Sequence, residues 1–277
     1  MMDEIQERLS AHVANLLARG QIAFTVEDTL KSLSVSKNTW VKNAQRLKNK
    51  GRLYSPRQGY YVIVPPQFMS WGAPPPSWFI DDLMQHEKRP YYVGLLKAAE
   101  LHDAAHQAVM DFQVITTARL PKIRAGRSTI SFHYRQDLAE LEPFIVKRKT
   151  DTGTMRISSP ELTALDLVRY SHAAAGFDNI LTVLTELGPK LDGARLAILC
   201  PQFERTVRQR LGYLLSRAGH ALAADVIHAS LRNDPRFQWK ELEPGKKSID
   251  PDLALGPLTR DQRWRLIIRG APTADEQ

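Results

Sequence analysis

Residues 31–57 read KSLSVSKNTWVKNAQRLKNKGRLYSPR, and this stretch decides the fold expected for the first part of the chain. It contains eight basic residues and no acidic residue. Ser36 is a favoured type of helix N-cap, and the helical spacing behind it ends at Gly51. The side of this helix expected to face a core carries Trp40, Val41, Ala44 and Leu47.

The other side of the same helix carries amide, hydroxyl and cationic groups. Asn and Gln can pair with adenine through two hydrogen bonds, and Arg or Lys can pair with guanine. The predicted outward residues are Asn38, Lys42, Gln45, Arg46 and Asn49, with Thr39 at the edge. This pattern predicts a recognition helix that enters a major groove. The alternative is a solvated face, although such faces usually mix both signs of charge.

The segments on either side of this helix complete a familiar motif. A helix is predicted before it, from Ile5 to Gly20, and a shorter one follows the expected N-cap Thr25. Strand formers then occur at 52–54 and 60–64, with the turn Ser55-Pro-Arg-Gln-Gly59 between them. Two helices about a tight turn followed by a hairpin predict a winged helix-turn-helix. A winged helix used only for protein docking is the alternative.

Prolines divide the chain. Five of them fall between Val64 and Trp78, where no regular element can run through. We therefore expect a DNA-binding domain at 1–64, a proline-rich linker at 65–77, and a larger mixed domain at 78–277. In the larger domain a helix is predicted over Tyr91–His106, then four strands between 112 and 157, then helices from Ser159 onward. Strands grouped before helices predict an α+β fold.

Composition sets limits on the function. The chain has 277 residues with 38 Lys+Arg against 30 Asp+Glu, a net charge of +8, and +5 of this charge lies in the first 65 residues. The distribution of charge therefore favours a polyanion as partner of the first domain. No apolar run is long enough to span a membrane. Asp3, Glu4 and Glu7 do not fit a secretory signal, so a cytoplasmic protein is expected.

Residues with catalytic or metal-binding chemistry are few. His102 and His106 have the spacing of zinc ligands, but Asp103 stands where a zinc protease needs Glu. The single Cys200 is expected to be a buried thiol. The Glu161 carboxylate is expected to stabilise the first turn of a helix, and Asp166 is expected to form an ion pair with Arg169 on the same helix. The sequence therefore predicts no enzyme activity, no metal site and no cofactor.

Two further basic stretches occur in the larger domain. They are predicted to be solvated faces, or a surface for an acidic protein partner or for flanking DNA. The residues assigned to this surface are Arg119, Lys122, Arg124, Arg127, Arg205 and Arg208.

Three segments of the larger domain carry a family resemblance: residues 91–102, YYVGLLKAAELH, residues 112–117, FQVITT, and residues 159–170, SPELTALDLVRY. Together with the order of the parts, they resemble the AbiEi-type antitoxins of type IV, abortive-infection toxin–antitoxin systems. The last two segments are the most specific marks, whereas Gly94 and Asp103 depart from the usual pattern of the family.

The resemblance implies properties beyond the residue patterns. It implies a repressor of its own promoter in phage defence, which binds inverted repeats in double-stranded operator DNA cooperatively, as a monomer or weak dimer. It implies a nucleotidyltransferase-type toxin as partner. By position it implies DNA contacts at Lys37, Asn38, Thr39, Lys42, Asn43 and Arg46, with Arg57 and Gln58 in the wing. Lys48 and Arg52 of the basic block complete the predicted set of DNA contacts. The alternative function is a standalone winged-helix transcription factor with a ligand-sensing C-terminal domain.

Overall fold

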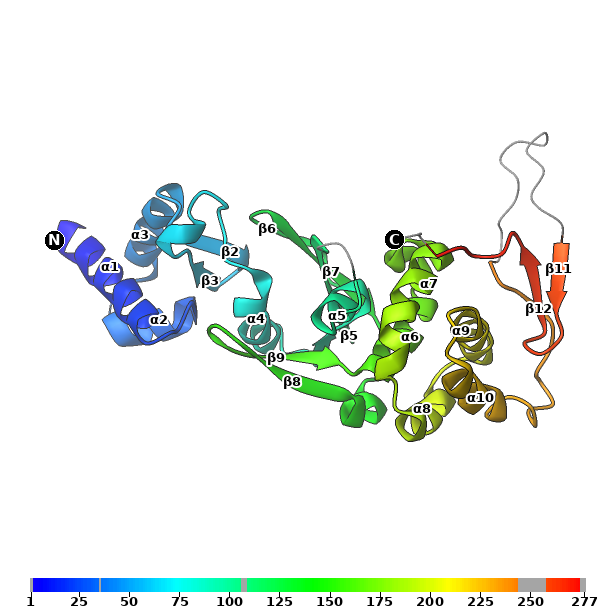
Figure 1. Ribbon diagram of the computed structural model, residues 1–277. Helices are drawn as coiled ribbons and strands as arrows, with labels where there is room; N and C mark the ends of the chain where they lie inside the picture. The colour runs from blue at the N-terminus through cyan, green and yellow to red at the C-terminus, as the bar shows by residue number, and fades with distance from the viewer. Residues whose placement is uncertain (1, 35, 106–108, 244–257, 275–277) are drawn as a thin grey trace. The chain divides into compact units, whose positions relative to one another are not determined.

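The chain folds into two compact units in the computed structural model, which describes residues 2–34, 36–105, 109–243 and 258–274 (Figure 1). The first unit comprises 1–93, 110–138 and 147–157, and the second comprises 94–109, 139–146 and 158–277. The segment expected to form one domain after residue 78 therefore contributes to both units. The mixed α+β fold class is confirmed, with helices and three separate sheets among the described residues.

The first 64 residues are called here the N-terminal module, and their described part contains three helices and a small sheet. Strand order in the sheet is β1-β3-β2, with antiparallel pairing throughout. The elements are α1 (Met2–Ala18), β1 (Ala23–Thr25), α2 (Val26–Leu33), α3 (Lys37–Asn49), β2 (Leu53–Arg57) and β3 (Tyr60–Ile63). Their shared core consists of Leu9, Val13, Phe24, Trp40, Ala44, Leu47, Leu53 and Ile63.

Side-chain caps set where α2 and α3 begin. The Thr25 hydroxyl accepts a hydrogen bond from the Asp28 backbone N–H at 3.1 Å and donates to the Asp28 carboxylate at 2.6 Å. The Ser36 hydroxyl accepts from the Thr39 N–H at 3.4 Å. Such caps satisfy N–H groups that have no partner within the helix. Both N-caps agree with the sequence prediction. Because Ser36 caps α3, this helix begins a short turn after α2 ends.

The proline-rich segment 65–77 is folded within the first unit. It forms two single-turn helices, η1 (Pro66–Phe68) and η2 (Pro76–Trp78), and the Phe68 ring lies 5.3 Å from Trp71 and 5.1 Å from Trp78 between centroids. A Cβ atom on Gly126 would lie 2.5 Å from the Trp71 carbonyl oxygen, so only glycine fits there. The segment therefore packs against the turn at Gly126.

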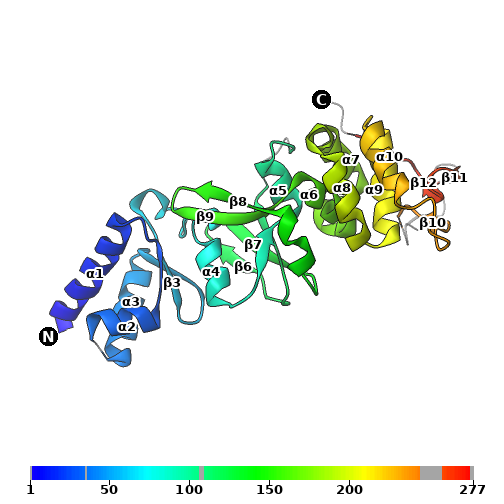
Figure 2. The ribbon, with the colours of Figure 1, turned by 90° about the horizontal axis from the view of Figure 1, so that it is seen from below.

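A six-stranded sheet forms the rest of the first unit. Its order is β6-β7-β5-β4-β9-β8, so the β6–β7 and β8–β9 pairs lie at opposite edges (Figure 2). β5 pairs in parallel with β7 and β4 in parallel with β9, whereas β4 and β5 are antiparallel. The strands are β4 (Tyr91–Val93), β5 (Asp111–Thr116), β6 (Ile123–Ala125), β7 (Ser128–Tyr134), β8 (Ile145–Thr150) and β9 (Gly153–Ser158), and helix α4 (Ile80–His86) precedes them.

The helix expected over Tyr91–His106 is wrong in its first part. Tyr91–Val93 forms strand β4, and α5 (Leu95–Leu101) begins only after Gly94. All three residues of β4 are buried within the sheet, and aromatic and β-branched side chains suit such a position. The Leu95 backbone has a φ of 56°, which lies in the left-handed region, so the chain changes direction between β4 and α5. His106 lies outside the described residues.

The second unit is mainly helical. Helix α6 (Pro160–Arg169) is its centre, with eight of ten residues buried. The other main elements are α7 (Gly176–Leu187), α8 (Gly193–Leu199), α9 (Arg205–Arg217), α10 (Ala221–Ala229) and a sheet of order β10-β12-β11. The sheet strands are β10 (Lys240–Glu241), β11 (Leu258–Asp261) and β12 (Leu266–Arg269). Within the described ranges, no helix combines the length and apolar character that crossing a membrane requires.

Candidate nucleic-acid interface

Helix α3 turns a polar and cationic face to solvent. Lys37, Asn38, Lys42, Gln45 and Asn49 are exposed, and its first turn contains no acidic residue. Thr39, Arg46 and Lys48 are partly exposed. Among the described residues, the ammonium groups of Lys37 and Lys42 have no ion-pair or hydrogen-bond partner. These two cations are therefore available to a phosphate or a base edge.

An amide pair lies on the same face. The Gln45 Nε2 donates to the Asn49 Oδ1 at 2.9 Å, and both side chains are exposed. The pair holds two amides in fixed orientation and leaves the Gln45 carbonyl oxygen and the Asn49 amino group to pair outward. Amides presented in this way can recognise adenine in a major groove. The face thus combines groups that contact phosphates with groups that recognise bases.

Two residues of α3 exchange the sides expected for them. Asn43 is 2% exposed and its Nδ2 donates to the Thr39 carbonyl at 3.0 Å, whereas Val41 is 49% exposed. The fully buried residues Trp40, Ala44 and Leu47 fix the direction of the core, and at about 100° per residue Asn43 lies nearer to that direction than Val41 does. Asn43 is therefore removed from the set of DNA contacts.

The tip of the β2–β3 hairpin, which is the expected wing, makes hydrogen bonds to other residues of the first unit. Arg57 is 19% exposed, and its Nε donates to the Glu87 carboxylate at 2.7 Å. Its Nη2 donates to the Pro121 carbonyl at 2.8 Å. The carbonyl of the exposed Gln58 lies 3.2 Å from the His86 Nε2. Arg57 thus already has a carboxylate partner, whereas Gln58 and the exposed Arg52 remain accessible.

The basic residues around β6 lie beside this hairpin. The Tyr54 hydroxyl of β2 donates to the Arg124 carbonyl at 2.7 Å, which joins β2 to β6. Lys122 and Arg124 are exposed. The Arg119 guanidinium stacks 5.2 Å above the Tyr134 ring and Arg127 stacks 4.8 Å above Trp71, with distances taken to the ring centroids. These four cations therefore belong to the same unit as α3.

Arg205 and Arg208, assigned to the same surface from the sequence, lie in the second unit. Arg208 is 9% exposed, and its Nη1 donates to the Ser230 carbonyl at 3.2 Å. It is a buried structural residue, contrary to the expectation of a surface contact. Its neighbours three and four positions away, Leu211 and Gly212, are buried too, so the charged residue lies on the inner side of α9. Arg205 pairs with Asp234 at 3.6 Å.

The residues with catalytic or metal-binding chemistry have structural partners. The Glu161 carboxylate is 2% exposed and accepts hydrogen bonds from the Ser159 hydroxyl and the Asp192 N–H, at 2.7 and 2.9 Å. Arg169, expected to pair with Asp166, has an ion pair with Glu204 at 2.8 Å. The His102 Nε2 bonds to the Ser158 carbonyl at 2.7 Å. No group of three or more His, Cys, Asp or Glu suited to a metal ion occurs in the part of the chain described.

Comparison with known proteins supports the resemblance seen in the sequence. Residues 92–217 match the family model of the AbiEi antitoxin C-terminal domain, which confirms the resemblance to AbiEi-type antitoxins over this segment. The fold as a whole is similar to the crystal structure of the RV2827C protein from Mycobacterium tuberculosis. The TM-score is 0.70 at 15% identity, over 94% of this chain and 90% of that one. No curated protein is significantly similar to the chain.

Proposed function

We propose that this antitoxin is also a DNA-binding repressor of its own promoter. In this proposal the N-terminal module is a winged helix-turn-helix, and α3 enters the major groove of operator DNA with inverted repeats. The observation that carries the proposal is the exposed, acid-free face of α3 over a core of Trp40, Ala44 and Leu47. A helix held this way on a compact module is the device by which helix-turn-helix proteins recognise DNA.

The exposed groups divide into two roles. Lys37, Lys48 and Arg52 are assigned to phosphates, because cations on phosphates provide affinity without sequence information. Asn38, Lys42 and Arg46 are assigned to base edges, with Thr39 beside them. Gln58 is assigned to the DNA backbone at the wing. Arg57 contacts a DNA phosphate only if its ion pair with Glu87 is broken. Arg119, Lys122, Arg124 and Arg127 contact the flanking duplex.

The antitoxin role extends the proposal to a partner. The AbiEi antitoxin domain supports a role in a toxin–antitoxin system. We infer that the partner is a nucleotidyltransferase-type toxin in a type IV, phage-defence system, and that the protein acts in the cytoplasm without membrane, metal or cofactor. We further infer a monomer or weak dimer that becomes cooperative on two neighbouring half-sites.

A charge-reversal variant tests the DNA proposal. The substitutions Lys42→Glu and Arg46→Glu place two negative charges on the exposed face of α3. These charges would repel the DNA phosphates, and the hydrogen bonds from the two cationic side chains to base edges would be lost. We expect operator affinity to fall at least a hundredfold in a gel-shift titration, since each good bidentate contact between a side chain and a base is worth about 1–3 kcal/mol. The logarithm of the wild-type affinity should decrease linearly with the logarithm of salt concentration.

A matched control separates local from global charge effects. Arg232→Glu with Arg260→Glu makes the same change in net charge at two exposed residues of the second unit. We expect this control to bind operator within about threefold of wild type, because screening removes most of the effect of distant charges. Equal losses in both variants, or unchanged affinity of the α3 variant, would contradict the assignment of α3.

A further inference from the structure

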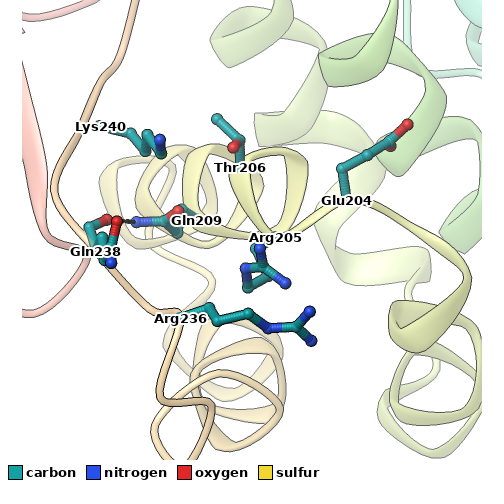
Figure 3. A pocket seen from close by; sticks show the side chains of 7 residues that line it. All are labelled: Glu204, Arg205, Thr206, Gln209, Arg236, Gln238 and Lys240. Atoms are coloured by element: carbon teal, nitrogen blue, oxygen red, sulfur yellow. Dashed lines mark hydrogen bonds between the residues drawn. The ribbon is translucent and has the colours of Figure 1, made fainter.

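A cationic pocket lies in the second unit, between the start of α9 and the segment that leads into β10. It encloses about 500 Å³, and Figure 3 shows its lining side chains. Arg205, Thr206 and Gln209 come from α9, whereas Arg236 and Lys240 come from the later segment. The later segment lies beyond residues 92–217, so the pocket combines the antitoxin domain with the part of the chain that follows it.

The positive charge of this pocket is only partly compensated. Arg205 and Arg236 lie on the same carboxylate, Asp234, at 3.6 and 3.5 Å. The Arg236 N–H donates to that carboxylate and lowers the pKa of Asp234, so the carboxylate stays ionised at neutral pH. One carboxylate balances one of the two guanidinium groups. The Glu204 carboxylate is paired with Arg169, which leaves Lys240 as a further positive charge at the pocket.

The N-terminus of α9 adds to this field. The helix has 13 residues, and its N-cap residue Glu204 makes no side-chain hydrogen bond to the first turn. Helix N-termini with uncapped N–H groups favour anions, because those groups and the helix dipole both carry positive charge there. The Thr206 hydroxyl lies in the same turn and lines the pocket. Guanidinium groups, N–H groups and a hydroxyl together form a typical environment for phosphate oxygens.

Gln209 gives the pocket an acceptor oxygen. Its side chain is 1% exposed, and its Nε2 donates to the Gln238 and Trp264 carbonyls, both at 3.0 Å. These two bonds fix the amide, as Figure 3 shows for Gln238. The Gln209 Oε1 has no hydrogen-bond partner among the described residues. This oxygen is open to the pocket, where it can accept a hydrogen bond from an O–H or N–H of a ligand.

We propose that this pocket binds a phosphate monoester of the size of a nucleotide or sugar phosphate. Its phosphate lies between Arg205, Arg236 and the start of α9, and a hydroxyl or amino group of the ligand donates to Gln209. The volume is within the usual range for small-ligand pockets, about 300–1,000 Å³. The site goes beyond DNA binding and toxin neutralisation, since neither role requires it.

Calorimetric titration of the full-length protein tests this proposal. The titrants are AMP, ribose 5-phosphate and adenosine at fixed ionic strength. We expect AMP to bind at least tenfold more tightly than adenosine, because only AMP carries the phosphate. Tighter binding of AMP than of ribose 5-phosphate would identify a nucleotide site, and equal binding would identify a sugar-phosphate site. Equal binding of AMP and adenosine, or no binding of either phosphate ester, would overturn the proposal.

A variant and its control locate the binding. Arg236→Gln with Lys240→Gln removes two cations whose side chains are exposed, so the fold should persist, as a circular-dichroism spectrum can verify. We expect AMP affinity to fall at least tenfold in this variant. Arg232→Gln removes a nearby exposed cation that does not line the pocket and should change the affinity less than twofold. Unchanged AMP binding by the double variant would overturn the proposal.

Discussion

At the residue scale, Cys200 shows how burial controls the chemistry of a side chain. The thiol is fully buried, and burial raises its pKa to about 11. The thiolate is the reactive form of cysteine, so at neutral pH the native thiol is both protonated and shielded. Cys200 is therefore a packing residue of the second unit, as expected from its position after an apolar helix.

This pKa gives a prediction about labelling with a thiol reagent. At pH 8.5 the native protein should react at least about a hundredfold more slowly than the urea-unfolded chain, whose thiol pKa is near 8.5. The folded pKa is higher than the unfolded one, so protonation favours the folded state. That contribution is fully present below about pH 8.5 and is lost as pH rises towards 11. Equal labelling rates of native and unfolded protein would contradict the buried assignment.

At the element scale, Glu161 joins the start of α6 to the start of α8. Its Oε1 accepts from the Asp192 N–H at 2.9 Å, and its Oε2 accepts from the Ser159 hydroxyl at 2.7 Å and lies 3.4 Å from the Arg195 Nε. Asp192 is itself the N-cap of α8. One buried carboxylate thus fixes the geometry of two helices, and this structural role accounts for it without catalysis.

Glu161→Ala is therefore expected to weaken the fold. Its loss leaves buried donors without partners, and we expect the free energy of unfolding to fall by about 2 kcal/mol. Urea denaturation of wild type and variant measures the change. Glu140→Ala replaces an exposed carboxylate and should alter the midpoint little. Full stability of the Glu161 variant would mean that the carboxylate is not held as described.

The sequence predicted these elements unevenly, for physical reasons. Ser159 and Pro160 gave α6 a start signal strong enough to be placed correctly. Strands β1 and β6 have three residues each, too few for a period, and neither was predicted. The sequence of β4 predicts a helix because Tyr91–Val93 is buried on both faces of the sheet, so its residues show no alternation of apolar and polar side chains. Arg236 and Lys240 were missed as pocket residues, since only the tertiary fold brings them to α9.

At the scale of the whole molecule, the N-terminal module is part of a larger compact unit. The Tyr60 hydroxyl donates to the Phe79 carbonyl at 3.3 Å, and Arg57 pairs with Glu87. A fragment beginning near Trp78 would lose these partners and expose a buried surface. Full-length variants are therefore the suitable material for separating DNA binding from antitoxin activity.

The central claim is that one chain combines DNA binding through α3 with a separable antitoxin activity. Its most direct test is growth rescue by the full-length variant Lys42→Glu/Arg46→Glu. The variant is expressed from a foreign promoter together with the cognate toxin, so repression does not alter the dose. We predict that it rescues growth as well as wild type does although it no longer binds operator DNA, because its changes are confined to α3. Loss of rescue by a variant that is folded and present at wild-type levels would contradict this account.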